Sequence, residues 1–320
     1  MPQISRYARF ASSTLLIASL FTLGCAGGNP SNSSNISSAA TTSLPAVAPG
    51  RAIWFWESTS QQAIIASSTA QDAAIANLKS WNVTQVYGSY SSQMATDPTD
   101  VRAWNAKLAA NGIASYFLVS TTSFFFPENW STAQSWIQTY FLSFNAASKT
   151  GEGFVGLAFD VEPQSFAGST TQPSWSAATP AQRRVYMTDM LDMLESSRAL
   201  LNNNAYTSTP IETYLTYNAS SLTSTIGWAS ADDRNAWYTA LAQTVDRVSV
   251  EEYGISSTAT ILNQYQTNDA LLNGKSRISL NSATGAEWTT ESQFWSAVTT
   301  TESQTSKFTD IEDYDTTTGP

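Results

Sequence analysis

Eight short apolar runs alternate with seven longer stretches of helical periodicity from Arg51 to the end of the chain. Such alternation is typical of βαβ units and a parallel sheet. Strands are predicted at Ala52–Trp56, Val83–Tyr87, Ile113–Val119, Phe154–Glu162, Ile211–Tyr217, Arg247–Tyr253, Arg277–Asn281 and Phe308–Tyr314. Helices are predicted near 70–80, 99–111, 131–147, 180–202, 232–244, 259–273 and 290–303. This element count predicts a single (β/α)8 barrel, the TIM barrel.

Chain length and helix boundaries agree with one barrel. The chain has 320 residues, and a barrel of roughly 250 residues fits within residues 49–320. Asp97-Pro98 and Thr179-Pro180 are helix starts, and Asn273-Gly274 is a helix end. A doubly wound open sheet would carry a glycine-rich phosphate loop after its first strand. No such glycines follow Trp56, so the barrel is favoured.

The N-terminal region is predicted to be an export signal and a tether. Residues 1–25 contain Arg6 and Arg9, then an apolar stretch that is too short for a convincing membrane span. Residues 21–25 resemble a bacterial lipobox, with Thr22 where Leu is preferred. This resemblance implies lipidation of Cys25 after cleavage. Residues 26–48 form a low-complexity linker. We expect a protein of the cell envelope, anchored by lipid; the alternative is an ordinary signal peptide and a secreted protein.

Composition excludes several kinds of chemistry. The chain contains no histidine, which removes Ser-His-Asp and Cys-His catalysis and the usual zinc ligands. A general acid or base must therefore be a carboxylate, Tyr, Lys or a group of the substrate. The net charge of −10 disfavours nucleic acid as a partner. Because no Lys/Arg run is present, membrane contact is expected only through lipid at Cys25. No cofactor is expected.

The fourth predicted strand carries two acids on its inward face. Residues two apart share a face of a strand. The outward set is Val155, Leu157, Phe159 and Val161, and the inward set is Gly156, Ala158, Asp160 and Glu162. Active sites of these barrels lie at the C-terminal ends of the strands. The pattern therefore predicts Asp160 and Glu162 at the barrel mouth. By the same alternation, the sixth strand presents Glu251 and Tyr253 there.

Aromatic and polar residues at the other strand ends suit a carbohydrate ligand. Candidate substrate-binding residues are Trp56, Glu57, Tyr87, Glu251, Asn281 and Asp313, and Trp54 and Trp288 are further candidates for stacking on sugar rings. No metal site is expected. The acid cluster at 310–315 is expected to be a solvated strand end, and a Ca²⁺ site formed by oxygen ligands is the alternative.

The run Gly156–Pro163 resembles the fourth-strand motif of barrel glycoside hydrolases. It is most similar to the Asp-x-Glu ending of the chitinase-like family 18. The resemblance implies that Glu162 is the general acid, that Asp160 orients the acetamido group of the substrate, and that Tyr253 assists. Residues 52–57 and 312–314 also resemble a group of secreted bacterial barrel proteins.

The sequence departs from family 18 at two places. Ala158 occupies the position of a further Asp, and Gly254 replaces the Asp that usually follows the sixth-strand Tyr. These changes leave open whether Asp160 has a raised pKa and takes part in a proton relay. Hydrolysis by two carboxylates needs a second acid opposite the first. Glu251, Asp313 and Glu287 are the candidates, and the sequence does not rank them.

Three functional hypotheses follow. The first is a glycoside hydrolase that acts on a polysaccharide, for which N-acetyl sugars are one candidate. The second is a non-catalytic carbohydrate-binding lipoprotein on the same barrel, and the third is a barrel that binds a partner in the envelope. The acids at the mouth also have a purely structural interpretation, as groups that Arg or backbone donors satisfy. A Glu162→Gln change separates the first two hypotheses, because it would abolish turnover but leave binding nearly intact.

Overall fold

The structure is a computed structural model that describes residues 49–222, 225–283 and 287–312. The predicted signal, linker and lipidation site at Cys25, together with Asp313, lie outside the described residues. Within the described part of the chain, no helix is both long and apolar enough to cross a membrane.

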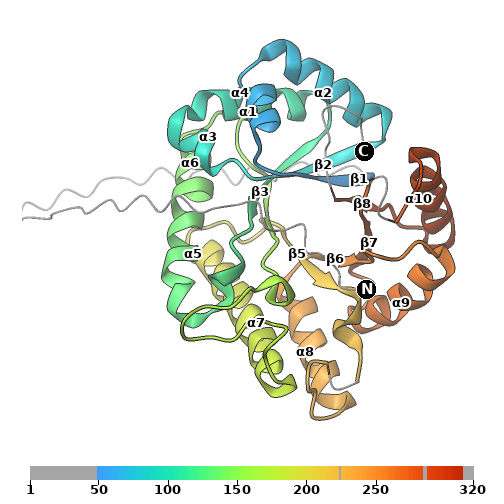
Figure 1. Cartoon of the computed structure of the whole chain (residues 1–320). Coiled ribbons are helices and arrows are strands. Elements are labelled where there is room, and N and C mark those ends of the chain that lie inside the picture. Colours follow the sequence, from blue (N-terminus) through green and yellow to red (C-terminus); the bar gives the residue numbers. More distant parts are fainter. Residues whose placement is uncertain (1–48, 223–224, 284–286, 313–320) are drawn as a thin grey trace, which may run out of the picture. The chain divides into compact units, whose positions relative to one another are not determined.

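The sheet is a closed barrel of eight parallel strands, with neighbours in the order β1 to β8 and β1 paired to β8 (Figure 1). The strands are β1 (Arg51–Phe55), β2 (Val83–Gly88), β3 (Ala114–Val119), β4 (Gly156–Phe159), β5 (Ile211–Thr216), β6 (Arg247–Glu251), β7 (Ser276–Leu280) and β8 (Asp310–Ile311). All eight predicted strands are present in the predicted order. The (β/α)8 barrel is therefore confirmed.

Helices surround the strands on the outside of the barrel (Figure 1). They are α1 (Thr59–Ile65), α2 (Ser68–Ser80), α3 (Ser91–Thr96), α4 (Pro98–Ala110), α5 (Trp130–Trp136), the π-helical segment η3 (Ile137–Ser143), α6 (Phe144–Ala146), α7 (Pro180–Asn203), α8 (Ala231–Thr244), α9 (Thr258–Leu271) and α10 (Glu291–Thr305). The seven predicted helical stretches are all found. Helices α1 and α3 were not predicted, because six or seven residues are too few to show a helical period.

The predicted helix boundaries have the expected geometry. The Asp97 side chain accepts a hydrogen bond from the Thr99 N–H, and Pro98 begins α4. Thr179 and Gln182 form a reciprocal capping box at the start of α7. After α9, Gly274 has a φ of 78°, a left-handed conformation that favours glycine.

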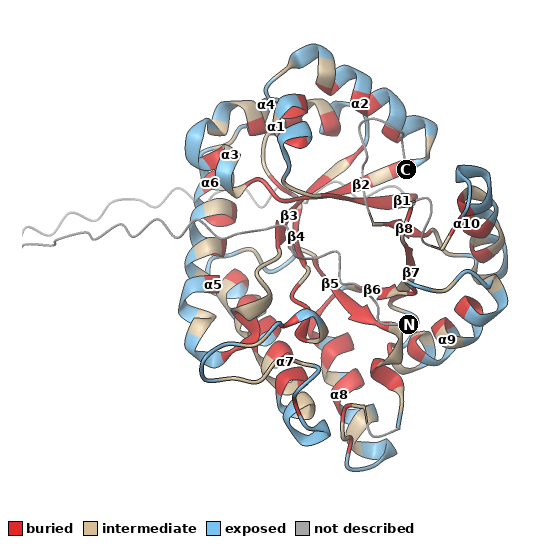
Figure 2. Cartoon of the chain, viewed as in Figure 1, coloured by how far each residue is buried: buried red, intermediate tan, exposed pale blue. Residues whose placement is uncertain are grey.

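Side chains of the strands alternate between two apolar regions. Leu157 and Phe159 of β4 point outward into the core shared with the helices, whereas Ala158 joins an inner cluster with Trp54 and Tyr116. In Figure 2 the strands are almost entirely buried, as this double packing requires. The prediction was wrong for Val155, which packs against the inner cluster. Because β4 begins only at Gly156, strand alternation does not apply to Val155.

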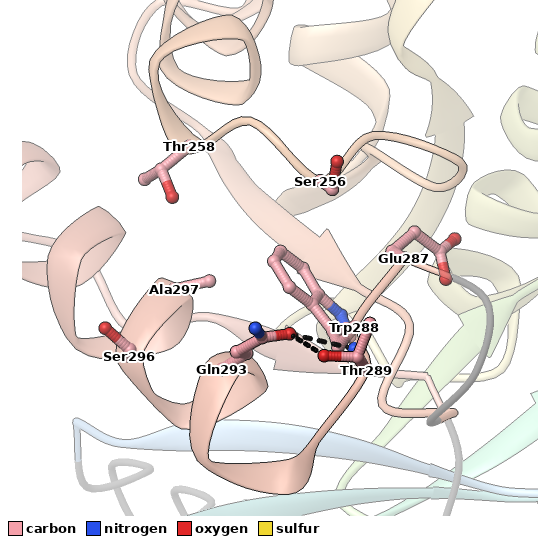
Figure 3. Close-up of a pocket in the computed structure, with 8 residues that line it drawn as sticks. All are labelled: Ser256, Thr258, Glu287, Trp288, Thr289, Gln293, Ser296 and Ala297. Carbon is pink, nitrogen blue, oxygen red and sulfur yellow. Dashed lines mark hydrogen bonds between the residues drawn. The ribbon is translucent and has the colours of Figure 1, made fainter.

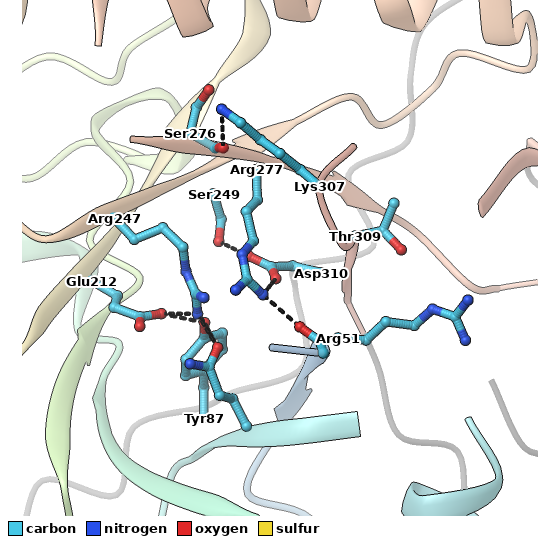
Figure 4. A network of polar contacts seen from close by, with 12 residues as sticks. Arg51, Tyr87, Glu212, Arg247, Ser249, Ser276, Arg277, Lys307, Thr309 and Asp310 are labelled. Carbon is cyan, nitrogen blue, oxygen red and sulfur yellow. Dashed lines mark hydrogen bonds and ion pairs between the residues drawn. The ribbon is translucent and has the colours of Figure 1, made fainter. Parts of the chain in front are cut away.

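A polar network fills the interior of the barrel below the mouth (Figure 4). Arg247 donates hydrogen bonds to Glu212 and Gln85, and Tyr87 hydrogen-bonds to Glu212. Buried groups of this kind need such partners, since an unpaired charge inside a protein is costly. The interpretation of Tyr87 as a substrate contact was therefore wrong: its side chain is fully buried.

A second part of the same network centres on Asp310 of β8. Asp310 is fully buried and accepts hydrogen bonds from Ser249 and Arg277. Arg277 also donates to the Gly50 carbonyl oxygen at 2.8 Å. The prediction of a solvated strand end was thus wrong for Asp310, because β8 carries its first residue into the barrel interior.

Candidate active site

The end of β4 positions the two acids that the sequence singles out. The Asp160 N–H donates to the Val119 carbonyl oxygen at 2.9 Å, so the β3–β4 ladder reaches Asp160. The strand then ends, earlier than predicted, because Pro163 begins the 3-10 turn η4 (Pro163–Ser165). Glu162 is the residue before this turn and is 6% exposed, whereas Asp160 is partly exposed. Both acids lie at the C-terminal end of the barrel, where such folds bind substrates.

Asp160 and Glu162 are hydrogen-bonded to each other. Burial raises the pKa of both carboxyl groups, most strongly that of Asp160. Their hydrogen bond raises the pKa of Asp160 and lowers that of Glu162, as expected when a protonated Asp160 donates to an ionised Glu162. The Ser165 hydroxyl also donates to Glu162. The pair therefore keeps a proton at a pH where ordinary carboxyl groups have lost theirs.

Glu251, the last residue of β6, is a third carboxyl group of the mouth. Burial raises its pKa well above the usual range, and the charge of Glu162 raises it further. The nearby polar groups of Tyr214 and Gln164 lower its pKa in part. The charge of Glu312, which follows β8, also acts on Glu251. Acids at the C-terminal ends of β4, β6 and β8 thus influence one another across the mouth.

Two tyrosines lie among these acids. The Tyr253 and Ser279 hydroxyl groups are 2.9 Å apart and share a hydrogen bond. Tyr214 of β5 is 5% exposed, and its ring lies 6.1 Å from that of Tyr253 and edge-on to Trp54. Sequence reasoning missed Tyr214. The signal was present, because alternation along β5 places Glu212, Tyr214 and Thr216 on one face.

The predicted aromatic contacts divide into two groups. Trp56 is partly exposed, stacks on Trp54 at 6.0 Å between ring centroids, and donates its indole N–H to the Glu312 carbonyl oxygen at 3.2 Å. It remains available to a ligand at the rim. Trp54 is only 2% exposed, so its ring presents no face for sugar stacking, and the prediction was wrong for this ring. Trp288 is 5% exposed but lines the hollow described below.

Glu57 and Asn281 have local roles at the loops. The Glu57 carboxylate accepts a hydrogen bond from Gln62 of α1 at 3.2 Å. The Asn281 side chain accepts from the Ala283 N–H at 2.8 Å, and its carbonyl oxygen accepts from the Trp288 indole at 2.8 Å. These contacts shape the loops after β1 and β7. No contact of either residue with the acids of the mouth is seen among the described residues.

Four further tryptophans belong to the helices that surround the barrel. Trp237 is 3% exposed and lies in the outer core. Trp130, Trp136 and Trp295 are partly buried and pack against that core. Trp237 is therefore a core residue, and the other three cover the edge of the core.

A hollow of about 440 Å³ lies beside the loops that follow β6 and β7 (Figure 3). Its lining is mostly hydroxyl, amide and carboxylate groups, from Ser256, Thr258, Glu287, Trp288, Thr289, Gln293, Ser296 and Ala297. Gly254, the neighbour of Tyr253, donates its N–H to Glu287 at 2.5 Å. The hollow therefore borders the loop that carries Tyr253. Such a lining, without Lys or Arg, can hydrogen-bond a neutral polar ligand.

The described residues contain no group of three or more Cys, Asp or Glu side chains arranged to hold a metal ion. Asp310, which belonged to the alternative Ca²⁺ site, is bonded to Ser249 and Arg277 instead.

No protein-family model and no curated protein matches the sequence. Solved structures are similar in fold. An exo-β-1,4-mannosidase from Opitutaceae bacterium strain TAV5 aligns at a TM-score of 0.51 and 9% identity, over 82% of this chain and 51% of that one. A D-psicose 3-epimerase from Clostridium cellulolyticum H10 aligns at 0.47 and 8% identity, over 82% and 84%. A class V chitinase from Nicotiana tobaccum aligns at 0.43 and 11% identity, over 73% and 67%.

The similarity to the mannosidase agrees with the closed barrel of this chain. At 9% identity it shows the (β/α)8 barrel and nothing finer. The chain spans about half the length of the mannosidase. The protein is thus a (β/α)8 barrel with a mouth that is lined by interacting carboxyl groups and aromatic rings.

Proposed function

We propose that the protein is a glycoside hydrolase that acts on a polysaccharide by carboxylate acid/base catalysis at the mouth of the barrel. One observation carries the proposal: the hydrogen-bonded pair Asp160–Glu162 lies at the C-terminal end of β4 and has raised pKa values. Cleavage of a glycosidic bond needs a carboxyl group that is still protonated near the working pH.

Glu162 is the proposed proton donor to the leaving oxygen. The pair holds its proton on Asp160, against Glu162, so this proton can pass to Glu162 as Glu162 protonates the leaving oxygen. Tyr253 is the proposed contact to the sugar. Burial keeps the pKa of Tyr253 well above the usual range, and its hydroxyl group therefore remains a neutral hydrogen-bond donor.

The groups at the rim of the barrel support the proposal of a carbohydrate ligand. Trp56 is a partly exposed ring beside the acids, and aromatic rings bind the apolar faces of sugars. The hollow beyond Gly254 extends the polar surface away from the mouth. A polysaccharide chain is long enough to contact both.

Hydrolysis of a panel of chromogenic glycosides and soluble polysaccharides, including chitin oligomers, by residues 49–320 tests the proposal. We expect turnover that Glu162→Gln abolishes and that the matched change Glu195→Gln, at an exposed position of α7, leaves intact. Equal turnover by the two variants would disprove the role of Glu162. Absence of turnover on every substrate would disprove the hydrolase.

A non-catalytic carbohydrate-binding barrel is the second candidate function. Ala158 occupies the position of a further Asp in the chitinase-like family 18. Its side chain is fully buried in the inner apolar cluster, so no carboxylate lies below Asp160 on β4. Isothermal titration of the Glu162→Gln variant with the same sugars tests this alternative. Binding with equal affinity by the wild type and the variant, without turnover by either, would support it.

We also propose that the barrel is exported and anchored in the cell envelope by lipid on Cys25. The lipobox-like run at residues 21–25 supports this proposal. Metabolic labelling of the full chain with a fatty acid should label the wild type and leave Cys25→Ala unlabelled. A labelled Cys25→Ala variant would disprove the anchor.

A further inference from the structure

Tyr253, the proposed contact to the sugar, follows β6 and is held at its hydroxyl group by β7. Its hydroxyl oxygen lies 2.9 Å from that of Ser279, and the two groups share a hydrogen bond. Ser279 is fully buried and pairs with Glu251 of β6 in the sheet of the barrel. The strand ladder therefore fixes the hydroxyl group that meets Tyr253, and this group holds the tip of the Tyr253 ring.

The backbone after Tyr253 is held from the loop that follows β7. The Gly254 N–H donates a hydrogen bond of 2.5 Å to Oε1 of Glu287. Gly254 has a φ of 77°, a left-handed conformation that glycine adopts readily. Because the peptide bond is planar, this hydrogen bond also fixes the orientation of the Tyr253 carbonyl group, and with it the backbone that carries the ring.

The Glu287 carboxyl group makes this contact with one oxygen. Its other oxygen, Oε2, has no hydrogen-bond partner among the described residues. An amide at this position would keep an accepting oxygen for Gly254, whereas a methyl group would not. Glu287 also lines the hollow beside the mouth (Figure 3). A sugar unit in the hollow would therefore lie against the side chain that holds the backbone of Tyr253.

We infer that Glu287 is a positioning residue for Tyr253: it holds the peptide that follows Tyr253, while Ser279 holds the hydroxyl group. The inference rests on the proposed function, in which Tyr253 contacts the sugar. A contact that is oriented before the substrate arrives costs less conformational entropy on binding. Removal of Glu287 should therefore weaken the contact of Tyr253 with the sugar, even for a substrate that is too short to reach the hollow.

Fluorine NMR tests the position of the ring without any substrate. Fluorotyrosine in place of Tyr253 provides one resonance that reports the surroundings of this ring. Glu287→Ala removes the acceptor and should shift or broaden this resonance, and Ser279→Ala should do the same. Glu287→Gln should restore the wild-type resonance, because its amide oxygen accepts from Gly254.

Glu291→Ala is the matched control for the resonance. Glu291 is exposed at the start of α10 and accepts a hydrogen bond of 3.0 Å from the Trp295 indole, so its loss should leave the resonance unchanged. Thermal unfolding of each variant checks that it is folded. An unchanged resonance in Glu287→Ala would overturn the inference, whether or not the protein is a hydrolase.

Kinetics separate this role from a contact within the hollow. With an aryl glycoside of one sugar, Glu287→Ala should lower kcat by about tenfold, the effect of one lost hydrogen bond on the transition state. Glu287→Gln should recover most of this loss. A residue that only lines the hollow would instead raise the KM for a polysaccharide and leave the short substrate unaffected.

An unchanged kcat of Glu287→Ala on the short substrate would therefore overturn the positioning role while the hydrolase stands. Absence of turnover by the wild type would overturn the hydrolase alone, because the comparison by fluorine NMR needs no turnover.

Discussion

Asp160 and Glu162 are hydrogen-bonded through their carboxyl groups at the end of β4, and this bond lowers the pKa of Glu162. Asp160→Ala removes the donor, so the pKa of Glu162 should rise. The alkaline limb of the kcat/KM profile reports deprotonation of the acid in the free enzyme. We therefore expect this limb to move to higher pH in Asp160→Ala.

Asp160→Asn is the control for this shift. Its amide N–H still donates to Glu162, and the alkaline limb should stay closer to that of the wild type. Kinetics of one chromogenic glycoside from about pH 4 to pH 10 would show the difference. The same limb in both variants would mean that the hydrogen bond does not tune the acid.

Tyr214 connects Glu251 to Tyr253 in the middle of the mouth. Tyr214→Phe removes the hydroxyl group that lowers the pKa of Glu251, so this pKa should rise and the acidic limb of kcat/KM should move to higher pH. The loss of this hydroxyl group from the mouth should also lower kcat by about tenfold, equivalent to roughly 1.4 kcal/mol. The partly buried Tyr140 of η3 provides a control, and Tyr140→Phe should change neither limb. An unshifted acidic limb in Tyr214→Phe would contradict the connection to Glu251.

The hollow beside the mouth predicts a dependence on substrate length. Ser296 is exposed and lines the hollow, so the large ring of Ser296→Trp should fill part of it. We expect a higher KM for a polysaccharide and an unchanged kcat/KM for a short aryl glycoside. Ser303→Trp, at an exposed position near the end of α10, serves as the control. Equal KM values for the two variants on the polymer would exclude the hollow from substrate binding.

Much of the fold could be predicted because the barrel repeats a local rule. Alternation along a strand sorts Ala158 from Leu157 and Phe159 without knowledge of any other strand, and the structure confirms this sorting. A Pro or Gly marks helix ends in the same local way, as at Pro98. These features depend on the backbone of one segment only, so the sequence of that segment is enough to predict them.

Depth along the barrel axis could not be predicted, because it depends on the register between strands. Tyr87 pairs with Trp54 and Tyr116, which places all three in the inner cluster and not at the mouth. The partners of Glu251 were equally hidden, since Tyr214 and Gln164 come from other strands or loops. Sequence alternation shows whether a side chain points into or out of the barrel. It does not specify the position of the side chain along the barrel axis or its neighbours on other strands.

Arg247 and Glu212 form an ion pair whose side chains are 11% and 6% exposed. Arg247→Met leaves Glu212 without its cation, and removing one partner of a buried pair costs about 3–5 kcal/mol. We expect a loss of this size in the free energy of unfolding, measured by urea denaturation at pH 7. Lys107→Met is the comparison. Lys107 pairs with Asp72, which is 67% exposed, and such surface pairs contribute about 0–1 kcal/mol. Equal losses in the two variants would contradict a stabilising network inside the barrel.

Glu252 is 1% exposed and neither of its carboxyl oxygens has a hydrogen-bond partner. Burial raises its pKa from 4.5 to about 9. The folded state therefore keeps the proton between these two values, whereas the unfolded state loses it. Below about pH 4.5 the carboxyl group of Glu252 is protonated in both states, and the free energy of unfolding of the wild type equals that of a protein with a permanently neutral side chain at this position. It falls by about 1.4 kcal/mol for each pH unit up to about pH 9.

Glu252→Gln replaces the titrating group with a neutral one of similar size. The variant should therefore become increasingly stable relative to the wild type as the pH rises from about 5 to about 9. Urea denaturation of both proteins at pH 5, 7 and 9 measures this difference directly, and Glu195→Gln at an exposed position should show no such trend. A constant difference between Glu252→Gln and the wild type across this range would mean that Glu252 ionises at its ordinary pKa in the folded protein. Its carboxyl group would then have to reach water or a donor through an opening of the loop that joins β6 to α9.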